Sequence, residues 1–298
     1  MTRQKMLEAL KIAIKDNNIN KIQEIVENNI NTFISNKEIT TFLENSRNVP
    51  SNKYSQYYCI TGSGGSKLKK PNITSIAFLY IASMGIPIVK TGSRAMTGTY
   101  GSTDLFEELN LCNREIDNKK YKFAYFDVFD TIRWLKYKKE LSKNECFNKY
   151  FCNTEIHEFK VKSKMTIQID ERKYEDFLNL KNINKPNELF VIYSSYKNKV
   201  IDEIMPGKIT INNDVFFSFE ENYEFYEVEN IKKIDYDLIK GKKVNDFWYE
   251  TLKLTIAIFL LVNNFTTSIK DGCKLFEEKY KNKSVIKMLK DIYISIWQ

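Results

Sequence analysis

Two loops rich in glycine and hydroxyl side chains contain the residues whose types and spacing predict phosphate binding. The first loop, residues 61–66 (TGSGGS), follows an expected strand and precedes an expected helix. Glycines let backbone N–H groups turn toward a phosphate, and the amino end of a helix adds partial positive charge. A loop of this kind also makes an ordinary turn, and it matches neither G-x-G-x-x-G nor a Walker sequence.

The second loop follows the next expected strand, where residues 90–94 (KTGSR) and 98–104 (GTYGSTD) combine cationic and hydroxyl side chains. Between the two loops, residues 72–75 (NITS) begin a helix, where their side chains can cap the helix or hold ligand oxygens. Ligands of α/β proteins usually bind where the carboxyl ends of parallel strands meet. Together the loops therefore predict a pocket for a polyanion.

The net charge of the chain is compatible with such a ligand. The 298 residues include 46 Lys and Arg against 38 Asp and Glu, which gives +8 at pH 7. An excess of this sign predicts either a nucleic acid or a phosphorylated small molecule as partner. A generic basic surface is the alternative, because much of the excess is Lys mixed with Glu and Asn.

The histidine and cysteine content excludes other chemistries. His157 is the sole histidine and the five cysteines contain no C-x-x-C pair, so zinc and iron–sulfur sites are not expected. The odd, dispersed cysteines and the lack of an apolar leader predict a cytoplasmic protein. The longest apolar run, residues 254–262, is shorter than the ~20 residues that a membrane helix needs, so no membrane partner is expected.

The elements that must position the two loops indicate an α/β fold. Residues 1–48 have apolar side chains at helical spacing and predict a small N-terminal helical lobe, joined by helices around residues 129–150. A polar connector follows this lobe. In residues 49–298, which begin with the connector, alternating strands and helices predict a larger α/β lobe with a mainly parallel central sheet.

In the larger lobe, the expected elements are helix 72–84, strand 86–90, strand 123–126, helix 131–141, strand 165–169, helix 171–180 and strand 191–193. Short alternating segments between residues 199 and 228 predict β-hairpins, and helices are expected from residue 247 onward.

Four sequence blocks in this order resemble the anthranilate phosphoribosyltransferase family and its relatives, the pyrimidine nucleoside phosphorylases. The family's G-T-G-G-D-G loop and N-I-S-T helix start correspond to residues 62–67 (GSGGSK) and 72–75. Its K-H-G-N-R strand end and S-G-S-A-D-x-L-E helix start correspond to residues 90–94 and 100–107 (YGSTDLFE). Residues 200–204 (VIDEI) are similar to its G-L-D-E-I segment, and the resemblance covers nearly the whole chain.

The resemblance implies a Mg²⁺-dependent phosphoribosyltransferase that binds phosphoribosyl pyrophosphate and a small-molecule acceptor. It implies catalytic roles for Lys90 and Ser102. It implies Mg²⁺ ligation by Asp202, Glu203 and Thr74, since this ion prefers carboxylates and phosphates. The residues implied to bind the donor are Gly62, Ser63, Gly64, Gly65, Asn72, Thr74, Ser75, Lys90 and Ser102.

Departures from the family pattern lie mainly on the acceptor side. Thr91 and Ser93 replace the histidine and asparagine of K-H-G-N-R, and Lys138 replaces the arginine that would face an anthranilate carboxylate. A lysine offers a point charge instead of a bidentate fork. We therefore expect Ser93 and Lys138 to bind an aromatic or heterocyclic nitrogen acceptor other than anthranilate.

Two other functions stay open from the sequence. A non-catalytic family member that binds nucleic acid would use the basic charge, including Lys67, Lys69 and Lys70 beside the first loop. A nucleoside phosphorylase would bind inorganic phosphate, although the K-H-S-T-G-G lead-in of those enzymes is absent before Gly64. A homodimer is also open, because the N-terminal lobe that carries the family's dimer contact is shorter here.

Overall fold

The computed structural model describes residues 2–63, 68–94, 100–152, 154–156, 158–169, 181–183, 185–197, 199–212, 214–218, 222–225 and 227–297. The chain divides into two compact units. The smaller unit comprises Met1–Ser55, Asp127–Lys160 and Asn179–Pro186. The larger unit comprises Gln56–Phe126, Val161–Leu178 and Asn187–Gln298.

The smaller unit is mainly helical and has its own core. Its elements are α1 (Arg3–Lys15), α2 (Ile19–Glu27), α3 (Asn36–Asn45), η1 (Ser51–Tyr54), α6 (Val128–Thr131), η2 (Arg133–Tyr137), α7 (Lys138–Leu141), α8 (Glu145–Cys152), β5 (Thr154–Ile156) and β7 (Lys181–Ile183). Apolar side chains of the first three helices pack with Trp134, Leu141 and Phe147 of the later segment. The two segments share one core because each amphipathic helix must bury its apolar stripe.

The helix expected over residues 131–141 is interrupted. Asp127 caps α6, its side chain accepting from two backbone N–H groups. Ile132 then leaves helical geometry and pairs with Arg47 in an antiparallel bridge, after which the chain continues as η2 and α7. The apolar spacing predicted one helix, whereas tertiary backbone pairing divides it into three short pieces.

The larger unit is organised around a nine-stranded sheet of order β11-β10-β8-β6-β1-β2-β4-β3, in which β9 pairs with β8. Its strands are β1 (Tyr58–Gly62), β2 (Ile88–Gly92), β3 (Arg114–Asp117), β4 (Lys122–Asp127), β6 (Ser163–Gln168), β8 (Glu188–Tyr196), β9 (Lys199–Val200), β10 (Lys208–Ile211) and β11 (Asp214–Ser218). The pairs β2–β1, β1–β6 and β6–β8 are parallel, and antiparallel strands flank them. The expected α/β class with a mainly parallel central sheet is confirmed.

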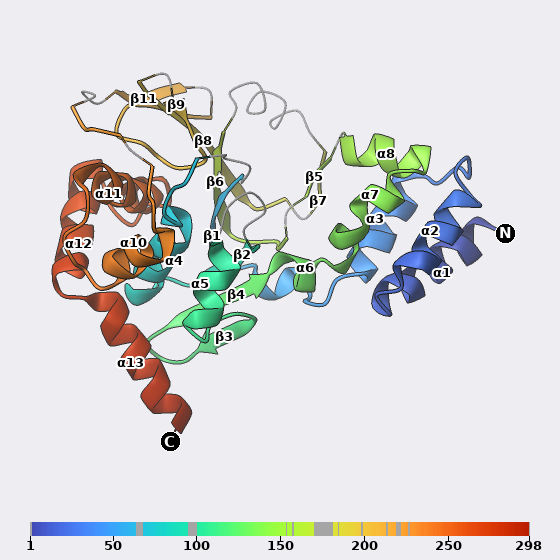
Figure 1. The fold of residues 1–298 in the computed structure, drawn as a ribbon, viewed down its shortest axis with the longest axis horizontal. Coiled ribbons are helices and arrows are strands. Elements are labelled where there is room, and N and C mark those ends of the chain that lie inside the picture. The colour runs from blue at the N-terminus through green and yellow to red at the C-terminus, as the bar shows by residue number, and fades with distance from the viewer. Residues whose placement is uncertain are drawn as a thin grey trace. The chain divides into compact units, whose positions relative to one another are not determined.

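Helices pack against this sheet and against one another (Figure 1). They are α4 (Ile73–Ser83), α5 (Ser102–Glu108), α10 (Ile231–Ile239), α11 (Asp246–Val262), α12 (Ile269–Lys281) and α13 (Ser284–Trp297). α4 is buried along nearly its whole length because it packs on β1 and β2 and also against α10, α11 and α13. Across the described ranges, no helix combines the length and apolar character needed to cross a bilayer.

Two further expectations for the larger unit have different outcomes. β10 and β11 form the antiparallel hairpin that the alternating pattern predicted. The alternating segment expected over residues 200–204 is a strand only at its start, because β9 ends at Val200 and residues 201–204 form a buried loop. The sequence pattern did not predict α10, and the helix expected over residues 171–180 lies outside the described residues.

Candidate active site

The end of β1 lies against an acidic segment from far along the chain. A Cβ atom on Gly62, the last residue of β1, would meet Asp202 Oδ2 at 2.8 Å and the Asp202 carbonyl oxygen at 2.9 Å. A real Cβ atom does not tolerate these separations, so glycine is what allows Asp202 to approach this closely. The structure thus places Gly62, a predicted donor-binding residue, beside Asp202, a predicted metal ligand.

The Asp202–Glu203 pair is buried, with exposed fractions of 6% and 1%. Ser194 of β8 fixes the backbone of this loop. Its hydroxyl donates to the Glu203 carbonyl oxygen at 2.7 Å and accepts from the Met205 N–H at 3.0 Å. Two adjacent carboxyl groups removed from water need a counter-charge nearby.

Lys70 supplies this counter-charge. Its Nζ lies 2.5 Å from Glu203 Oε1 and 3.3 Å from Asp202 Oδ1. Burial opposes the charge on Lys70, but the two carboxylates outweigh burial and raise the pKa of the ammonium above its ordinary value. Burial also raises the pKa of Glu203 to about 7, an increase that Lys70 opposes and the Asp202 charge reinforces. The three side chains form one coupled, buried ionic group.

Lys90 of β2 lies next to this group. Its side chain is buried, and its Nζ donates to the Ile60 carbonyl oxygen of β1 at 3.3 Å. Its charge acts to lower the pKa of Glu203, so the two side chains are within electrostatic reach. Two lysines and two carboxyl groups therefore gather beside β1 and β2.

Another buried acid holds the start of α4. The side chain of Asn72, expected as a cap, does not cap this helix. Its backbone N–H and its Nδ2 donate instead to Asp235 Oδ1 and Oδ2, at 2.9 Å and 2.7 Å. Asp235 is fully buried, and burial raises its pKa to about 7 although the hydrogen bonds from Asn72 act to lower it. We use the name Lys70 cluster for Lys70, Asn72, Lys90, Asp202, Glu203 and Asp235.

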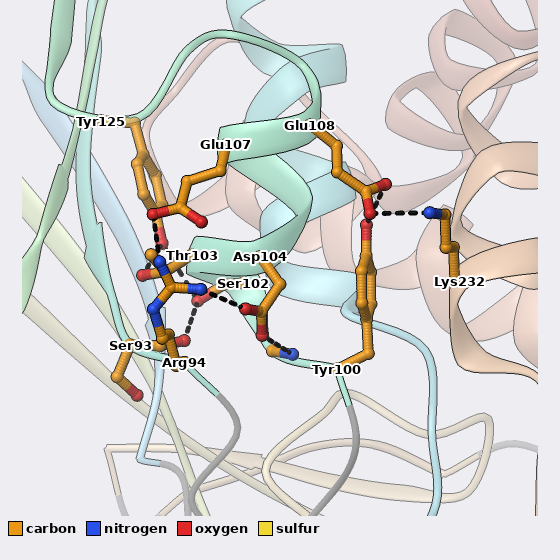
Figure 2. Close-up of polar contacts among 11 residues, drawn as sticks. Ser93, Arg94, Tyr100, Ser102, Thr103, Asp104, Glu107, Glu108, Tyr125 and Lys232 are labelled. Carbon is orange, nitrogen blue, oxygen red and sulfur yellow. Dashed lines mark hydrogen bonds and ion pairs between the residues drawn. The ribbon is translucent and has the colours of Figure 1, made fainter.

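Ser102 begins α5 and lies beside the end of β2. Its Oγ donates to the Ser93 carbonyl oxygen at 3.3 Å and accepts from the Tyr125 hydroxyl at 3.2 Å. A Cβ atom on Gly92 would come within 2.1 Å of Ser102 Oγ, so this strand end also requires glycine. Figure 2 shows Tyr125 of β4 directed toward the hydroxyl groups of Ser102 and Thr103.

The acidic side chains of α5 neutralise Arg94 (Figure 2). Arg94 Nη1 lies 2.7 Å from Asp104 Oδ1, and its Nη2 pairs with Glu107. Because the Arg94 side chain is 60% exposed, water screens these pairs. We use the name Ser102 cluster for Ser93, Arg94, Ser102, Asp104 and Tyr125.

α10 contacts both α4 and α5 through polar side chains. Glu108, at the end of α5, accepts from Lys232 at 2.7 Å (Figure 2) and from Tyr236 at 3.1 Å, and both donors belong to α10. The same helix provides Asp235, which holds Asn72 at the start of α4. The relative position of α4 and α5 is therefore fixed through α10.

The structure brings most of the predicted site residues into these two places. Those in the Lys70 cluster or directly against it are Gly62, Asn72, Lys90, Asp202 and Glu203. Thr74 and Ser75 are buried in the first turn of α4, and the exposed Ser63 follows β1. Ser93 and Ser102 meet in the Ser102 cluster.

Three predicted residues remain. Gly64 and Gly65 lie outside the described residues. Lys138 belongs to the smaller unit, where its Nζ lies 5.5 Å from the centre of the Phe151 ring. Within the described ranges, no group of three or more His, Cys, Asp or Glu side chains is arranged to hold a metal ion.

Sequence reasoning gave no role to four residues that organise the site. Lys70 was predicted only as part of a basic stretch, and no role was predicted for Ser194, Asp235 or Tyr125. A signal existed for Lys70, because an adjacent acidic pair in a largely apolar segment needs a buried cation. Asp235 carried no comparable signal, since its helix had not been predicted.

Part of the chain matches known proteins in sequence, and most of it matches known proteins in fold. Residues 56–125 match a family model described as the α/β domain of a glycosyl transferase family. The anthranilate phosphoribosyltransferase of Staphylococcus saprophyticus is 30% identical over 125 residues, which cover 39% of this chain and 36% of the relative. The enzyme of the same name from Staphylococcus epidermidis is 24% identical over 150 residues, covering 47% and 45%. These matches span less than half the length of the relatives.

Solved structures of the same name share the fold over most of the chain. The anthranilate phosphoribosyltransferase of Thermus thermophilus has a TM-score of 0.60 at 13% identity, covering 98% of this chain and 94% of that chain. The Saccharomyces cerevisiae enzyme, in complex with PRPP and Mg, has a TM-score of 0.62 at 16% identity, covering 95% and 82%.

Proposed function

We propose that this chain is a member of the anthranilate phosphoribosyltransferase-like glycosyl transferase family and transfers a phosphoribosyl group from phosphoribosyl pyrophosphate to a nitrogen acceptor. The observation that carries the proposal is the meeting of Asn72, Lys90 and the Asp202–Glu203 pair beside β1 and β2. These residues come from distant segments, and each corresponds to a donor-site position of the family pattern.

The proposed reaction breaks the bond between ribose C1′ and a pyrophosphate oxygen. The bond to the acceptor nitrogen forms on the opposite face of the sugar, and pyrophosphate leaves with the bonding electron pair. Lys90 is the buried cation available to stabilise the developing negative charge, and the amino end of α4 adds a partial positive charge. Ser102 is the proposed hydroxyl contact to a phosphate oxygen.

The proposed acceptor is an aromatic or heterocyclic nitrogen compound other than anthranilate. Ser93 and Lys138 are the proposed acceptor residues, and neither supplies the planar fork that an anthranilate carboxylate would pair with. The hydrogen bond from Ser102 Oγ to the Ser93 carbonyl oxygen supports neighbouring roles for the proposed donor residue Ser102 and the proposed acceptor residue Ser93.

Magnesium is the proposed cofactor, and one relative has been solved in complex with PRPP and Mg. The proposed ligands, Asp202, Glu203 and Thr74, do not fit the ion as they stand. The two carboxylates already face the Lys70 ammonium, and among the described residues no third His, Cys, Asp or Glu side chain joins them to form a metal-binding group. No step of the proposed transfer uses a metal bound at this pair.

Calorimetric titration tests the proposal. Phosphoribosyl pyrophosphate should bind more tightly than inorganic phosphate or ribose 5-phosphate, because the site would hold both the pyrophosphate and the sugar. Binding of inorganic phosphate alone would favour a nucleoside phosphorylase. Binding of an oligonucleotide that weakens as salt rises, without donor binding, would favour the nucleic-acid alternative.

A further inference from the structure

Lys70 faces the two carboxylates to which the family resemblance assigns a divalent cation. Its Nζ contacts a carboxylate oxygen of Glu203 at 2.5 Å and one of Asp202 at 3.3 Å. The exposed fractions of the three side chains are 15%, 2% and 8%. This is a buried ion pair with a shared cation, unlike the exposed lysine pairs elsewhere on the chain, such as Lys120 with Asp291.

The backbone on both sides of Lys70 is fixed. Before it, the Lys69 N–H donates to Glu227 Oε2 at 3.1 Å, and the Lys69 carbonyl oxygen accepts from Val228 N–H at 2.9 Å. After it, Asn72 is held by both oxygens of Asp235. Lys70 is thus anchored at each end, so its ammonium is directed to the acidic pair by the fold.

A magnesium ion does not fit beside this ammonium. Mg²⁺ requires near-octahedral oxygen coordination, and it strongly repels another cation in a buried site. Within the described residues, Glu203 Oε2 is buried and accepts no hydrogen bond, which leaves this oxygen for a donor group of a ligand. A sugar hydroxyl satisfies such an acceptor without adding charge.

We propose that Lys70 is a built-in cation that takes the place of a protein-bound metal ion at Asp202 and Glu203. The inference rests on the proposed function, because it concerns the same donor site. The acidic pair, already compensated by Lys70, then acts as hydrogen-bond acceptor for the sugar. Any metal that accompanies the donor is carried by its phosphates and not by these carboxylates.

Titration with Mn²⁺ alone, followed by calorimetry and by electron paramagnetic resonance, tests this proposal. The Lys70→Met variant should bind one Mn²⁺ at least about tenfold more tightly than the wild type, because the competing charge is gone. Adding Asp202→Asn to this variant should abolish the binding. Lys70→Arg is the matched control, which keeps the cation and should exclude the metal as the wild type does.

Equal Mn²⁺ affinity of the wild type and folded Lys70→Met overturns the proposal. If Lys70→Met does not fold, the wild type and Asp202→Asn decide the question. Wild-type binding of Mn²⁺ that Asp202→Asn removes contradicts the proposal, and its absence at millimolar Mn²⁺ supports it. No donor is present in these titrations, so failure of donor binding, measured separately, is distinguishable from failure of this inference.

Discussion

The Lys70 cluster and the Ser102 cluster lie by neighbouring strands, yet they place charge in opposite surroundings. In the Lys70 cluster, the Lys70 side chain is 15% exposed, and it faces the side chains of Asp202 and Glu203, which are 8% and 2% exposed. In the Ser102 cluster, the 60% exposed Arg94 pairs with carboxylates that are 23% and 44% exposed. Water screens the second set of pairs and is largely excluded from the first.

This difference shows that the location of a charge decides its energetic and chemical effect. The net charge of +8 counts Lys70 and Arg94 alike. Removing Lys70 would leave two buried carboxylates without their shared cation, whereas the exposed Arg94 follows β2 and pairs with carboxylates of α5. We therefore expect substitutions in the two clusters to have unequal effects.

The largest effect on stability is expected at Lys70. Lys70→Met leaves Asp202 and Glu203 buried without their shared cation and should lower the free energy of unfolding by about 3–5 kcal/mol. Arg94→Met, the matched control in the exposed cluster, should change this free energy little. Urea denaturation of both variants measures the difference, and equal losses would break the comparison.

Lys90 should have the next largest effect, on ligand binding. Lys90→Met removes a buried cation from the proposed donor site and should weaken the affinity for phosphoribosyl pyrophosphate by about 10- to 100-fold. Lys164→Met is the matched control. Lys164 is as buried as Lys90, but it lies near the start of the neighbouring strand β6, where it pairs with Cys59 of β1. Calorimetry measures both variants, and a comparable loss in the control would contradict the assignment of Lys90.

Gly92 offers a test of how closely the Ser102 cluster is packed. A Cβ atom there would lie 2.1 Å from Ser102 Oγ and 2.2 Å from the Tyr125 hydroxyl, so Gly92→Ala should destabilise the protein by about 1–3 kcal/mol. Adding Tyr125→Phe removes one of the two clashing oxygens and should recover part of the loss. Thermal unfolding of the single and double variants measures the recovery, and additive losses would refute this packing.

Asp235 should produce a specific dependence of stability on pH. Its pKa is raised from 3.8 to about 7 by burial, so the folded state holds the proton more tightly than the unfolded state. The resulting contribution to stability is complete below about pH 4 and is lost as pH rises through 7. Asp235→Asn should flatten this decline, and Asp237→Asn on the same helix should not. Denaturation curves from pH 4 to pH 8 test the slope.

The sequence predicted the local parts of this site because their signals are local. The glycines at positions 62 and 92, the start of α4 at Asn72 and the lysine in β2 belong to contiguous blocks whose composition indicates turns, helix starts and strand ends. The parallel sheet followed from the order of these blocks.

The remaining parts depend on contacts that join distant segments. Nothing near Lys70 indicates that its ammonium meets Glu203, because that contact requires the loop after β9 to be fixed by Ser194. The broken helix at Ile132 has the same origin, since Arg47 provides its backbone partner. Sequence patterns therefore do not predict which side chains from distant segments meet in the fold.

The most direct test of the central claim is a crystal structure of the protein soaked with phosphoribosyl pyrophosphate. The account predicts density for the pyrophosphate within hydrogen-bond reach of Lys90, with the sugar hydroxyls directed at Glu203 and no metal on its carboxylate. Donor density away from Lys90 and Asn72, or a clear site without donor at saturating concentration, would contradict the claim.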